Sequence, residues 1–294
     1  MFTDASRSAE PLLDLVTAMA FCKLLAVLVL MHNIGGFLGA EVRSSIIGGR
    51  NADESKWRWM VHLNITSRDK ANKWRCGGTV LNQQWVLTSA SCWDEQRRPN
   101  KDRSMAWVGS YNLKTYRGRY KGISQIITHP GYYSSGGTYK NDIALVKLKT
   151  KIESWAEVKN VNLPSANDIF DSSSECWIAG WGYIEDNVPL PDPETLQELK
   201  IPIVPQNECK ATYPELTDDM LCAGARGKDG CKGDNGGPLM CLGASGLKQV
   251  GILSYGSPNG CGLAGQPSIY AKVSQYLSFI NDNIPRGEET SAEV

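Results

Sequence analysis

Gly233-Asp234-Asn235-Gly236-Gly237-Pro238 is the stretch that decides the fold of this 294-residue chain, and three further stretches precede it in a fixed order. They are Ile46-Ile47-Gly48-Gly49, then Cys76-Gly77-Gly78 with Thr88-Ser89-Ala90-Ser91-Cys92, and then Asp142-Ile143-Ala144-Leu145. Two others accompany them, Cys176-Trp177-Ile178-Ala179-Gly180-Trp181-Gly182 and Ser254-Tyr255-Gly256.

The composition around these stretches favours a globular β protein. Apolar residues make up 41% of the chain and charged residues 21%, so a core can form and wholesale disorder is excluded. The 29 Gly, 14 Pro and 9 Trp favour many turns and aromatic-filled β structure over long helices. The 31 basic and 31 acidic side chains cancel, which argues against a dedicated nucleic-acid binder.

Short β-branched or alternating runs between turn residues predict the strands. They are Val80-Leu81, Trp85 to Thr88, Ile143 to Leu148, Trp177-Ile178-Ala179 and Val250 to Leu253. A convincing helix is predicted only over residues 274–284, with Ser274 as its cap and Pro285 as its stop. Leu277, Ile280 and Ile284 share one face of it, and residues 286–294 form a polar tail.

The first forty-five residues predict a secreted, extracellular protein. Residues 24–31 form an apolar run that is too short to span a bilayer, and small residues ending in Ala40 follow it. We therefore expect an N-terminal extension and signal peptide over residues 1–40, a short propeptide over 41–45, and no stable membrane span. Initiation at Met19 instead of Met1 gives a more ordinary signal. A signal anchor is the weaker alternative.

Cysteine usage points to the same oxidising compartment. Cys22 leaves with the signal, and an even set remains: Cys76, Cys92, Cys176, Cys209, Cys222, Cys231, Cys241 and Cys261. No pair has zinc-finger spacing with histidines nearby, so we expect neither a metal site nor a cofactor. Asn64-Ile65-Thr66 is an N-glycosylation sequon, which predicts a glycan on Asn64 in a surface loop.

Together the quoted stretches resemble the trypsin-like serine protease family over residues 46–285. Ile201 to Pro205 and Ser268 to Val273 are most similar to its tryptase and testis-protease branch. The resemblance implies an all-β fold of two six-stranded antiparallel β-barrels packed together, over about residues 46–160 and 161–273, followed by the C-terminal helix. The working cleft lies between the barrels. The implied disulfides are Cys76–Cys92, Cys176–Cys241, Cys209–Cys222 and Cys231–Cys261, which use every remaining cysteine.

Two of the three catalytic side chains of this family are missing. Hydrolysis needs a serine nucleophile, a histidine that takes its proton and a carboxylate that orients the histidine. The family motif places the histidine where this chain has Ser91, and a serine hydroxyl is no base near neutral pH. It places the nucleophile where this chain has Asn235, whose amide nitrogen is a very poor nucleophile. Only the orienting carboxylate, Asp142, remains.

No other histidine is a candidate base. His32 leaves with the signal, His62 belongs to a predicted strand of the first barrel, and His129 precedes a proline in a turn. Losing the base or nucleophile of such a triad removes roughly six orders of magnitude in turnover. The resemblance still assigns an oxyanion hole to the backbone N–H groups of Gly233 and Asn235. We therefore expect the three triad positions to form a polar plug, in which the Ser91 hydroxyl and backbone N–H groups or water bond the buried carboxylate.

This chain also lacks the basic residue that precedes the activation cut in the family. The resemblance implies a cut before Ile46, whose new ammonium group pairs with Asp234. Trypsin-like convertases need Arg or Lys before the cut, but Ser45 stands there and Arg43 is the nearest basic residue. A cut after Arg43 leaves about 7 Å of extra chain. We expect a zymogen-like molecule, and N-terminal sequencing that finds Ile46 first would contradict this.

The cleft keeps residues that the family uses to bind peptides. Asp229 matches the acid at the floor of the specificity pocket, and Ser268 stands where active members have glycine, so the pocket is narrowed. Ser254, Tyr255 and Gly256 match the segment that pairs with a bound peptide backbone. These residues indicate either a cleft that binds without cutting or inherited architecture with no ligand.

Two basic runs offer a weaker hypothesis, a sulfated glycan. Arg117, Arg119 and Lys121 alternate and so share one face of a predicted strand. Arg97, Arg98, Lys101 and Arg103 form a basic loop. Such short runs are more often solvated faces.

The sequence therefore predicts a secreted, inactive serine protease homologue that binds peptides, inhibitors or a protein partner without cleaving. Its partner would be an extracellular protein or peptide, such as a protease inhibitor or an active relative. One rival is a trypsin-like endopeptidase that uses non-standard residues. Another is a glycan-binding or structural extracellular component.

Overall fold

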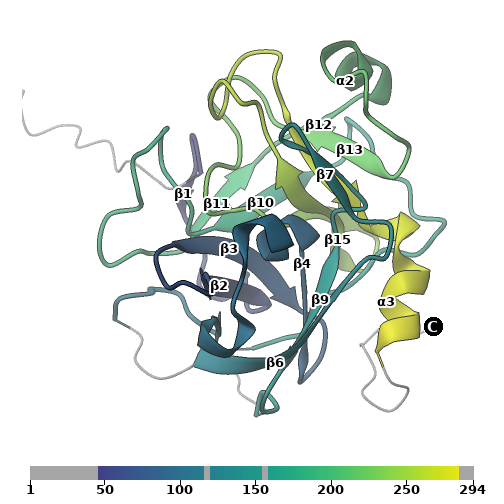
Figure 1. Ribbon diagram of the computed structural model, residues 1–294. Helices are drawn as coiled ribbons and strands as arrows, with labels where there is room; N and C mark the ends of the chain where they lie inside the picture. The colour runs from purple at the N-terminus through teal and green to yellow at the C-terminus, as the bar shows by residue number, and fades with distance from the viewer. Residues whose placement is uncertain (1–45, 116–119, 154–157, 285–294) are drawn as a thin grey trace, which may run out of the picture. The chain divides into compact units, whose positions relative to one another are not determined.

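The computed structural model describes residues 46–115, 120–153 and 158–284, and Figure 1 shows a mostly β protein with few and short helices. The signal peptide, the propeptide with Ser45, the basic residues Arg117 and Arg119, and the polar tail all lie outside the described residues. Predictions that depend on them stay predictions.

The first sheet is a closed antiparallel barrel. Its strands, in order around the barrel, are β2 (Met60–Thr66), β3 (Lys73–Val80), β4 (Trp85–Thr88), β9 (Ala144–Leu148), β6 (Tyr120–Thr128) and β5 (Met105–Val108). This confirms the predicted six-stranded barrel. Residues 85–88 form β4 as predicted, and the apolar run that ends at Leu148 forms β9. Strands buried on their inward face close into a barrel because closure removes unpaired sheet edges.

The second sheet is antiparallel and barrel-like, but it has eight strands and is not closed, where six were predicted. Its order is β1 (Arg50–Asn51), β11 (Gln197–Lys200), β10 (Cys176–Gly180), β14 (Pro238–Gly243), β15 (Gly246–Tyr255), β16 (Ser268–Lys272), β13 (Met220–Ala223) and β12 (Ile203–Val204). The extra strands are the two-residue pieces at its ends. β1 pairs with β11, so the N-terminal segment joins the second sheet although it precedes the first.

The C-terminal helix differs from its prediction at the start. A 3-10 turn, η5 (Val273–Gln275), comes first, and α3 (Leu277–Asn283) follows with Tyr276 as its N-cap. Ser274 therefore lies in the turn and does not cap the helix. The predicted apolar face is present, since Ile280 and Ile284 are buried. The other α-helix is α2 (Gln206–Thr212), and β7 (Tyr133–Ser135) and β8 (Thr138–Lys140) form a hairpin.

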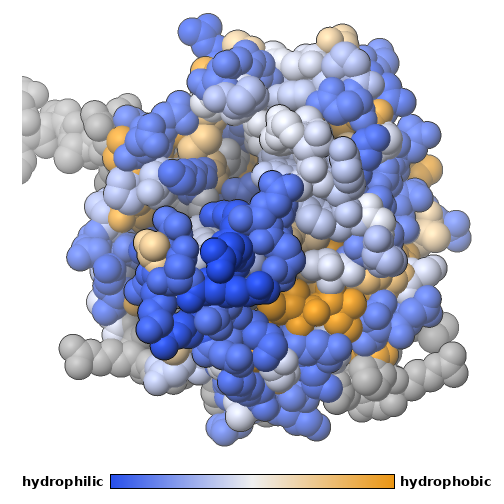
Figure 2. Space-filling model, viewed as in Figure 1, coloured by the Kyte–Doolittle hydropathy of each residue, from blue (hydrophilic) through white to orange (hydrophobic). Residues whose placement is uncertain are grey.

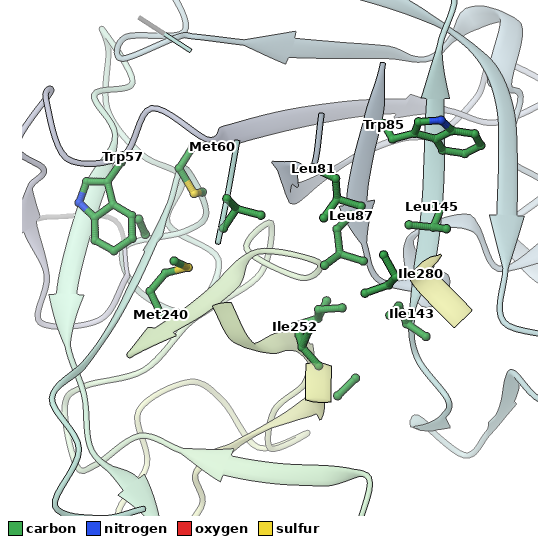
Figure 3. Close-up of a cluster of buried hydrophobic side chains, with 14 of the residues drawn as sticks. Trp57, Met60, Leu81, Trp85, Leu87, Ile143, Leu145, Met240, Ile252 and Ile280 are labelled. Carbon is green, nitrogen blue, oxygen red and sulfur yellow. The ribbon is translucent and has the colours of Figure 1, made fainter. Parts of the chain in front are cut away.

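An apolar core joins the two sheets. Leu87 and Leu145 come from the first barrel, Met240 and Ile252 from the second sheet, and Ile280 from α3 (Figure 3). All five side chains are fully buried. Because burial of one such side chain contributes about 1.5–3 kcal/mol, this shared core holds the two sheets in a fixed relation.

The four expected disulfides are confirmed. The bonds are Cys76–Cys92, Cys176–Cys241, Cys209–Cys222 and Cys231–Cys261. Cys176 and Cys241 face each other directly across β10 and β14. The bond from Cys231 ties the turn that carries Asn235 to a distant loop, so the disulfides fix the loops around the cleft as well as the sheets.

Candidate functional site

The strand register brings the three triad positions together. Ser91 lies in η2 (Ala90–Trp93), the 3-10 turn that follows β4, and Asp142 lies just before β9. Because Thr88 of β4 pairs with Ala144 of β9, these two segments meet at the same end of the barrel. Asn235 lies in the turn before β14 of the second sheet.

Asp142 is a buried carboxylate held by two close donors. The backbone N–H of Ser91 donates to Oδ1 at 2.6 Å, and the hydroxyl of Ser254 donates to Oδ2 at 2.5 Å. Burial raises the pKa of Asp142 to about 6, and these hydrogen bonds offset part of that effect. A backbone N–H donor to this carboxylate was expected from the sequence, and the donor is the N–H of Ser91 itself.

Ser254 connects the triad positions Asp142 and Asn235. The side-chain amide of Asn235 donates to the carbonyl oxygen of Ser254 at 2.6 Å, while the Ser254 hydroxyl bonds Asp142. The Ser91 hydroxyl donates to Ser89 Oγ at 3.1 Å. The three positions therefore form one hydrogen-bonded polar cluster, with Ser254 as the link. Sequence reasoning assigned Ser254 only to peptide pairing, and no spacing in the sequence indicates this contact.

Both described histidines are held in packing contacts. The ring of His62 lies edge-on to Trp181, with centroids 5.8 Å apart, and burial together with the charge of Arg75 lowers its pKa to about 3. His129 accepts from Gly131 N–H at 3.1 Å and lies against Phe279 of α3, with centroids 5.0 Å apart. Neither histidine makes a contact with the polar cluster, and His62 is uncharged near neutral pH.

The turn before β14 keeps two free backbone donors. Among the described residues, the N–H groups of Gly233 and Asn235 have no hydrogen-bond acceptor. The turn needs glycine at residue 236, where φ is +81° and a Cβ atom would lie 2.2 Å from Thr88 Oγ1. These are the two N–H groups to which the resemblance assigns an oxyanion hole, and that role stays a prediction.

The first described residue, Ile46, is buried against Tyr183, which follows a residue that donates to Asp234. Ile46 is fully buried, and its N–H donates to Tyr183 O at 3.2 Å. The Asp234 carboxylate accepts from the N–H groups of Gly182 at 2.8 Å and of Cys231 at 3.1 Å. Burial raises the pKa of Asp234 to about 7, and the nearby Asp229 adds to the rise. The resemblance implies an ion pair between a freed Ile46 ammonium and Asp234, and that pair stays a prediction. Whether the chain is cut before Ile46 stays a prediction.

Two residues that the resemblance assigns to the specificity pocket, Asp229 and Ser268, are buried and lie close together. Asp229 is only 1% exposed, and its Oδ2 accepts from Gly262 N–H at 3.2 Å. Ser268 is likewise buried, and its Oγ lies 2.9 Å from the place where a Cβ atom on Gly256 would stand. Burial raises the pKa of Asp229 to about 6, which the Ser268 hydroxyl partly offsets. The close approach of the Ser268 hydroxyl to Gly256 is consistent with a narrowed pocket, which stays a prediction.

The open part of the cleft is strongly basic. A cavity of about 460 Å³ borders Ser91 and Asn235, and four cationic side chains line it: Lys73, Arg75, Arg97 and Lys232. Its aromatic lining residues are Trp74, Tyr139 and Tyr183. Sequence reasoning placed Arg97 in a surface loop and did not single out the other three cations. They lie far apart in the chain, so no local run of charge marks them.

The two predicted basic runs do not form one free surface. Arg117 and Arg119 lie outside the described residues, and Lys121 donates to the carbonyl oxygen of Lys151 at 3.0 Å. The loop with η3 (Glu95–Arg97) and η4 (Lys101–Arg103) lies under the strongly hydrophilic surface in Figure 2. Acidic partners are mixed into it, as in the pair of Lys101 with Asp102 at 3.1 Å.

The sequon does not lie on a loop. Asn64 is in the middle of β2, paired with Arg75 of β3 and Met105 of β5, and is half-buried. Thr66 of the same sequon is buried. The predicted loop position was wrong because the sequon is read over three residues, whereas strand pairing depends on distant segments.

Potential metal ligands gather at one place in the described residues. There, one group of potential ligands lies close together, made of Asp186, Cys231 and Cys261, but its two sulfurs are joined in a disulfide. A disulfide sulfur is not the thiolate that binds metals. No helix in the described part of the chain is long and apolar enough to cross a membrane.

Comparisons with known proteins agree with the family resemblance of the sequence. The family model described as Trypsin matches residues 46–280. "Tryptase" of Mus musculus is 37% identical over 262 residues, which cover 84% of this chain and 91% of the mouse protein. "Coagulation factor XI" of Bos taurus is 35% identical over 246 residues, which cover 82% of this chain and 38% of the bovine protein.

Proposed function

The chain belongs to the trypsin family of serine proteases, and we propose that it is a secreted member that binds a peptide or protein in its cleft without cutting it. One observation carries the proposal: the side chain at the nucleophile position is an amide, Asn235, whose nitrogen donates to Ser254 O. That nitrogen has no lone pair to offer to a carbonyl carbon.

The proton transfers of peptide hydrolysis also lack a carrier. The base must take a proton from the nucleophile and later give one to the leaving amine. Ser91 stands at the base position with its hydroxyl bonded to Ser89, and both described histidines pack elsewhere. Asp142 is covered by two donors and has no imidazole to orient. Acylation therefore has neither a first nor a second proton step.

Binding does not need these groups. The free N–H groups of Gly233 and Asn235 still point to an anion or carbonyl site, and the cavity beside them is open. The four disulfides and the N-terminal signal sequence support an extracellular location. We therefore place its partner among extracellular peptides and proteins, such as a protease inhibitor or an active relative.

Purified protein is expected to leave a panel of fluorogenic Arg and Lys peptides uncut. The physical reason is the missing base and nucleophile, which together account for roughly six orders of magnitude in turnover. Release of fluorophore is compared with that of an Asn235→Ala variant, purified in the same way, which measures any contaminating protease. Turnover by the natural sequence that clearly exceeds turnover by this variant would support the endopeptidase alternative.

The Ser268→Gly variant is expected to bind p-aminobenzamidine, a probe of pockets with an acidic floor, at least about tenfold more tightly than the natural sequence, a difference of about 1.4 kcal/mol. Removing the hydroxyl clears the space beside Gly256 and exposes Asp229. Probe fluorescence in a titration measures the affinity. The matched control is Ser172→Gly, at an exposed position in another part of the chain. Equal affinities for all three proteins would show that Ser268 does not close the pocket.

A further inference from the structure

The residues that line the cleft beside Asn235 include more cationic than anionic side chains. Its lining includes the four cations named above and no Asp or Glu. The chain as a whole has equal numbers of basic and acidic side chains, so the imbalance is local to this cavity. A concave surface with one sign of charge concentrates ligands of the opposite sign.

Two of these cations are available to a ligand. Within the described residues, Lys73 and Lys232 make no ion pair or hydrogen bond through their side chains, and both are exposed. The Lys232 ammonium lies 5.4 Å from the centre of the Tyr183 ring. Each therefore offers donors to a ligand without first breaking a contact with a carboxylate.

The other two cations are fixed and add to the field. Arg75 donates to both carboxylate oxygens of Glu194 at 3.0 Å, which holds its guanidinium in place. The guanidinium of Arg97 lies 4.0 Å from the centre of the Trp74 ring, and the charge of Asp94 acts on it. Arg75 and Arg97 border the cleft, and Arg97 packs on the Trp74 ring. The charges of these two arginines are already partly balanced by Glu194 and Asp94.

Backbone donors complete the site. The N–H groups of Gly233 and Asn235 have no acceptor among the described residues and border the same cavity as Lys232. Paired N–H groups beside an ammonium group form a strong acceptor site for a carboxylate, because hydrogen bonds to a charged oxygen are about twice as strong as neutral ones.

We infer that the cleft takes an acidic segment of a partner protein, an extended peptide with carboxylates for the Gly233/Asn235 N–H pair and for Lys73. This inference rests on the proposed function, since a peptide that is not cut can stay bound. A peptide is favoured over a sulfated glycan because three aromatic residues line the cavity together with the cations, and aromatic rings pack against side-chain and backbone carbons.

The test is fluorescence anisotropy with a short fluorescein-labelled peptide of alternating glutamates and with its glutamine counterpart, at neutral pH and physiological salt. The glutamate peptide is expected to bind at least about tenfold more tightly, and Lys73→Glu/Lys232→Glu is expected to abolish this preference. Binding should weaken as salt is raised, because the lysines are exposed. The matched control is Lys159→Glu/Arg226→Glu, which makes the same change in net charge at exposed positions outside the cavity.

The outcomes separate this inference from the proposed function. Equal affinity for the two peptides would overturn the acidic preference and leave a non-cleaving peptide binder. Loss of binding in both double variants would show that only overall charge matters, which also overturns it. A heparin oligosaccharide that binds through Lys73 and Lys232 when the glutamate peptide does not bind would assign the cleft to a sulfated glycan. Cleavage of the glutamine peptide would instead contradict the proposed function itself.

Discussion

Ser91→His/Asn235→Ser is expected to react covalently with a fluorophosphonate at residue 235, where the natural sequence stays unlabelled. The fold already supplies the rest of the centre. Asp142 is buried beside position 91, and the N–H groups of Gly233 and Asn235 are unoccupied. A histidine in η2 would lie between the carboxylate and the new serine, which is the arrangement that activates a hydroxyl.

The size of this effect follows from the chemistry of the triad. Removing a base or nucleophile costs roughly six orders of magnitude in turnover, so restoring both moves the protein from background to measurable reaction. The variant is made with a cleavable segment before Ile46, so that the released ammonium can pair with Asp234. Mass spectrometry of the labelled peptide locates the adduct.

Two matched variants make this test specific. Asn235→Ser alone should label far more slowly, because no base takes the proton of the new hydroxyl. Ser91→His/Asn235→Ala should not label at all. A double repair variant that is folded, released at Ile46 and still inert would contradict the view that only these two positions disable the centre.

The free energy of unfolding is expected to fall as pH rises from about 5 to about 8, by about 1–2 kcal/mol per pH unit near pH 6. Three buried carboxyl groups cause this. Burial raises the pKa of Asp142 and Asp229 to about 6 and that of Asp234 to about 7, from an ordinary value of 3.8. The folded protein therefore holds protons that the unfolded chain releases, and this stabilisation is lost as pH rises through the folded values.

His62 acts in the opposite direction but in a lower range. Its pKa of about 3 lies below the ordinary 6.5, so its contribution grows as pH rises and is complete near pH 6.5. One imidazole offsets only one of the three carboxyl groups. Above about pH 7, Asp234 is the main group that still titrates among these four residues, because its pKa of about 7 is the highest. Urea denaturation with the disulfides intact, at several pH values, measures the slope.

Asp234→Asn identifies the group responsible. Whatever its absolute stability, this variant should show a free energy of unfolding that depends less on pH between about pH 6 and 8, because it lacks the Asp234 carboxyl that titrates there. The same flattening is expected for the natural sequence once it carries a free Ile46 ammonium, because an adjacent cation lowers the pKa of a carboxyl. A stability that rises from pH 5 to pH 8 would contradict the burial of these unpaired carboxyl groups.

The sequence predicted the fold well because its strong signals were local and ordered. β4 is a short run of strand-forming residues with turn residues before and after it. The cysteines could be paired once the ordered stretches were matched to the family. The two short strands at the ends of the second sheet were missed. β1 and β12 are two residues long, so no periodicity can mark them, and they form through pairing with distant strands.

The candidate site was predicted only in part, because motifs mark single positions but not the contacts between side chains that are distant in sequence. Ser91, Asp142 and Asn235 follow motifs, and the structure brings them together. The Ser254 hydrogen bond to Asp142 and the cluster of cations in the cleft depend on side chains that are distant in sequence. Ser274 shows how far helix caps can be predicted from sequence. A serine before an apolar run matches the N-cap pattern, but Ser274 lies in the turn η5, outside the helix.

Intact-mass spectrometry of the purified natural protein after exposure to a fluorophosphonate tests most directly whether the cleft has lost its chemistry. With an amide at position 235 and no imidazole in contact with Asp142, the mass should remain unchanged while a tryptase treated in parallel gains one adduct. A stoichiometric adduct on any residue that borders the cleft would contradict this account.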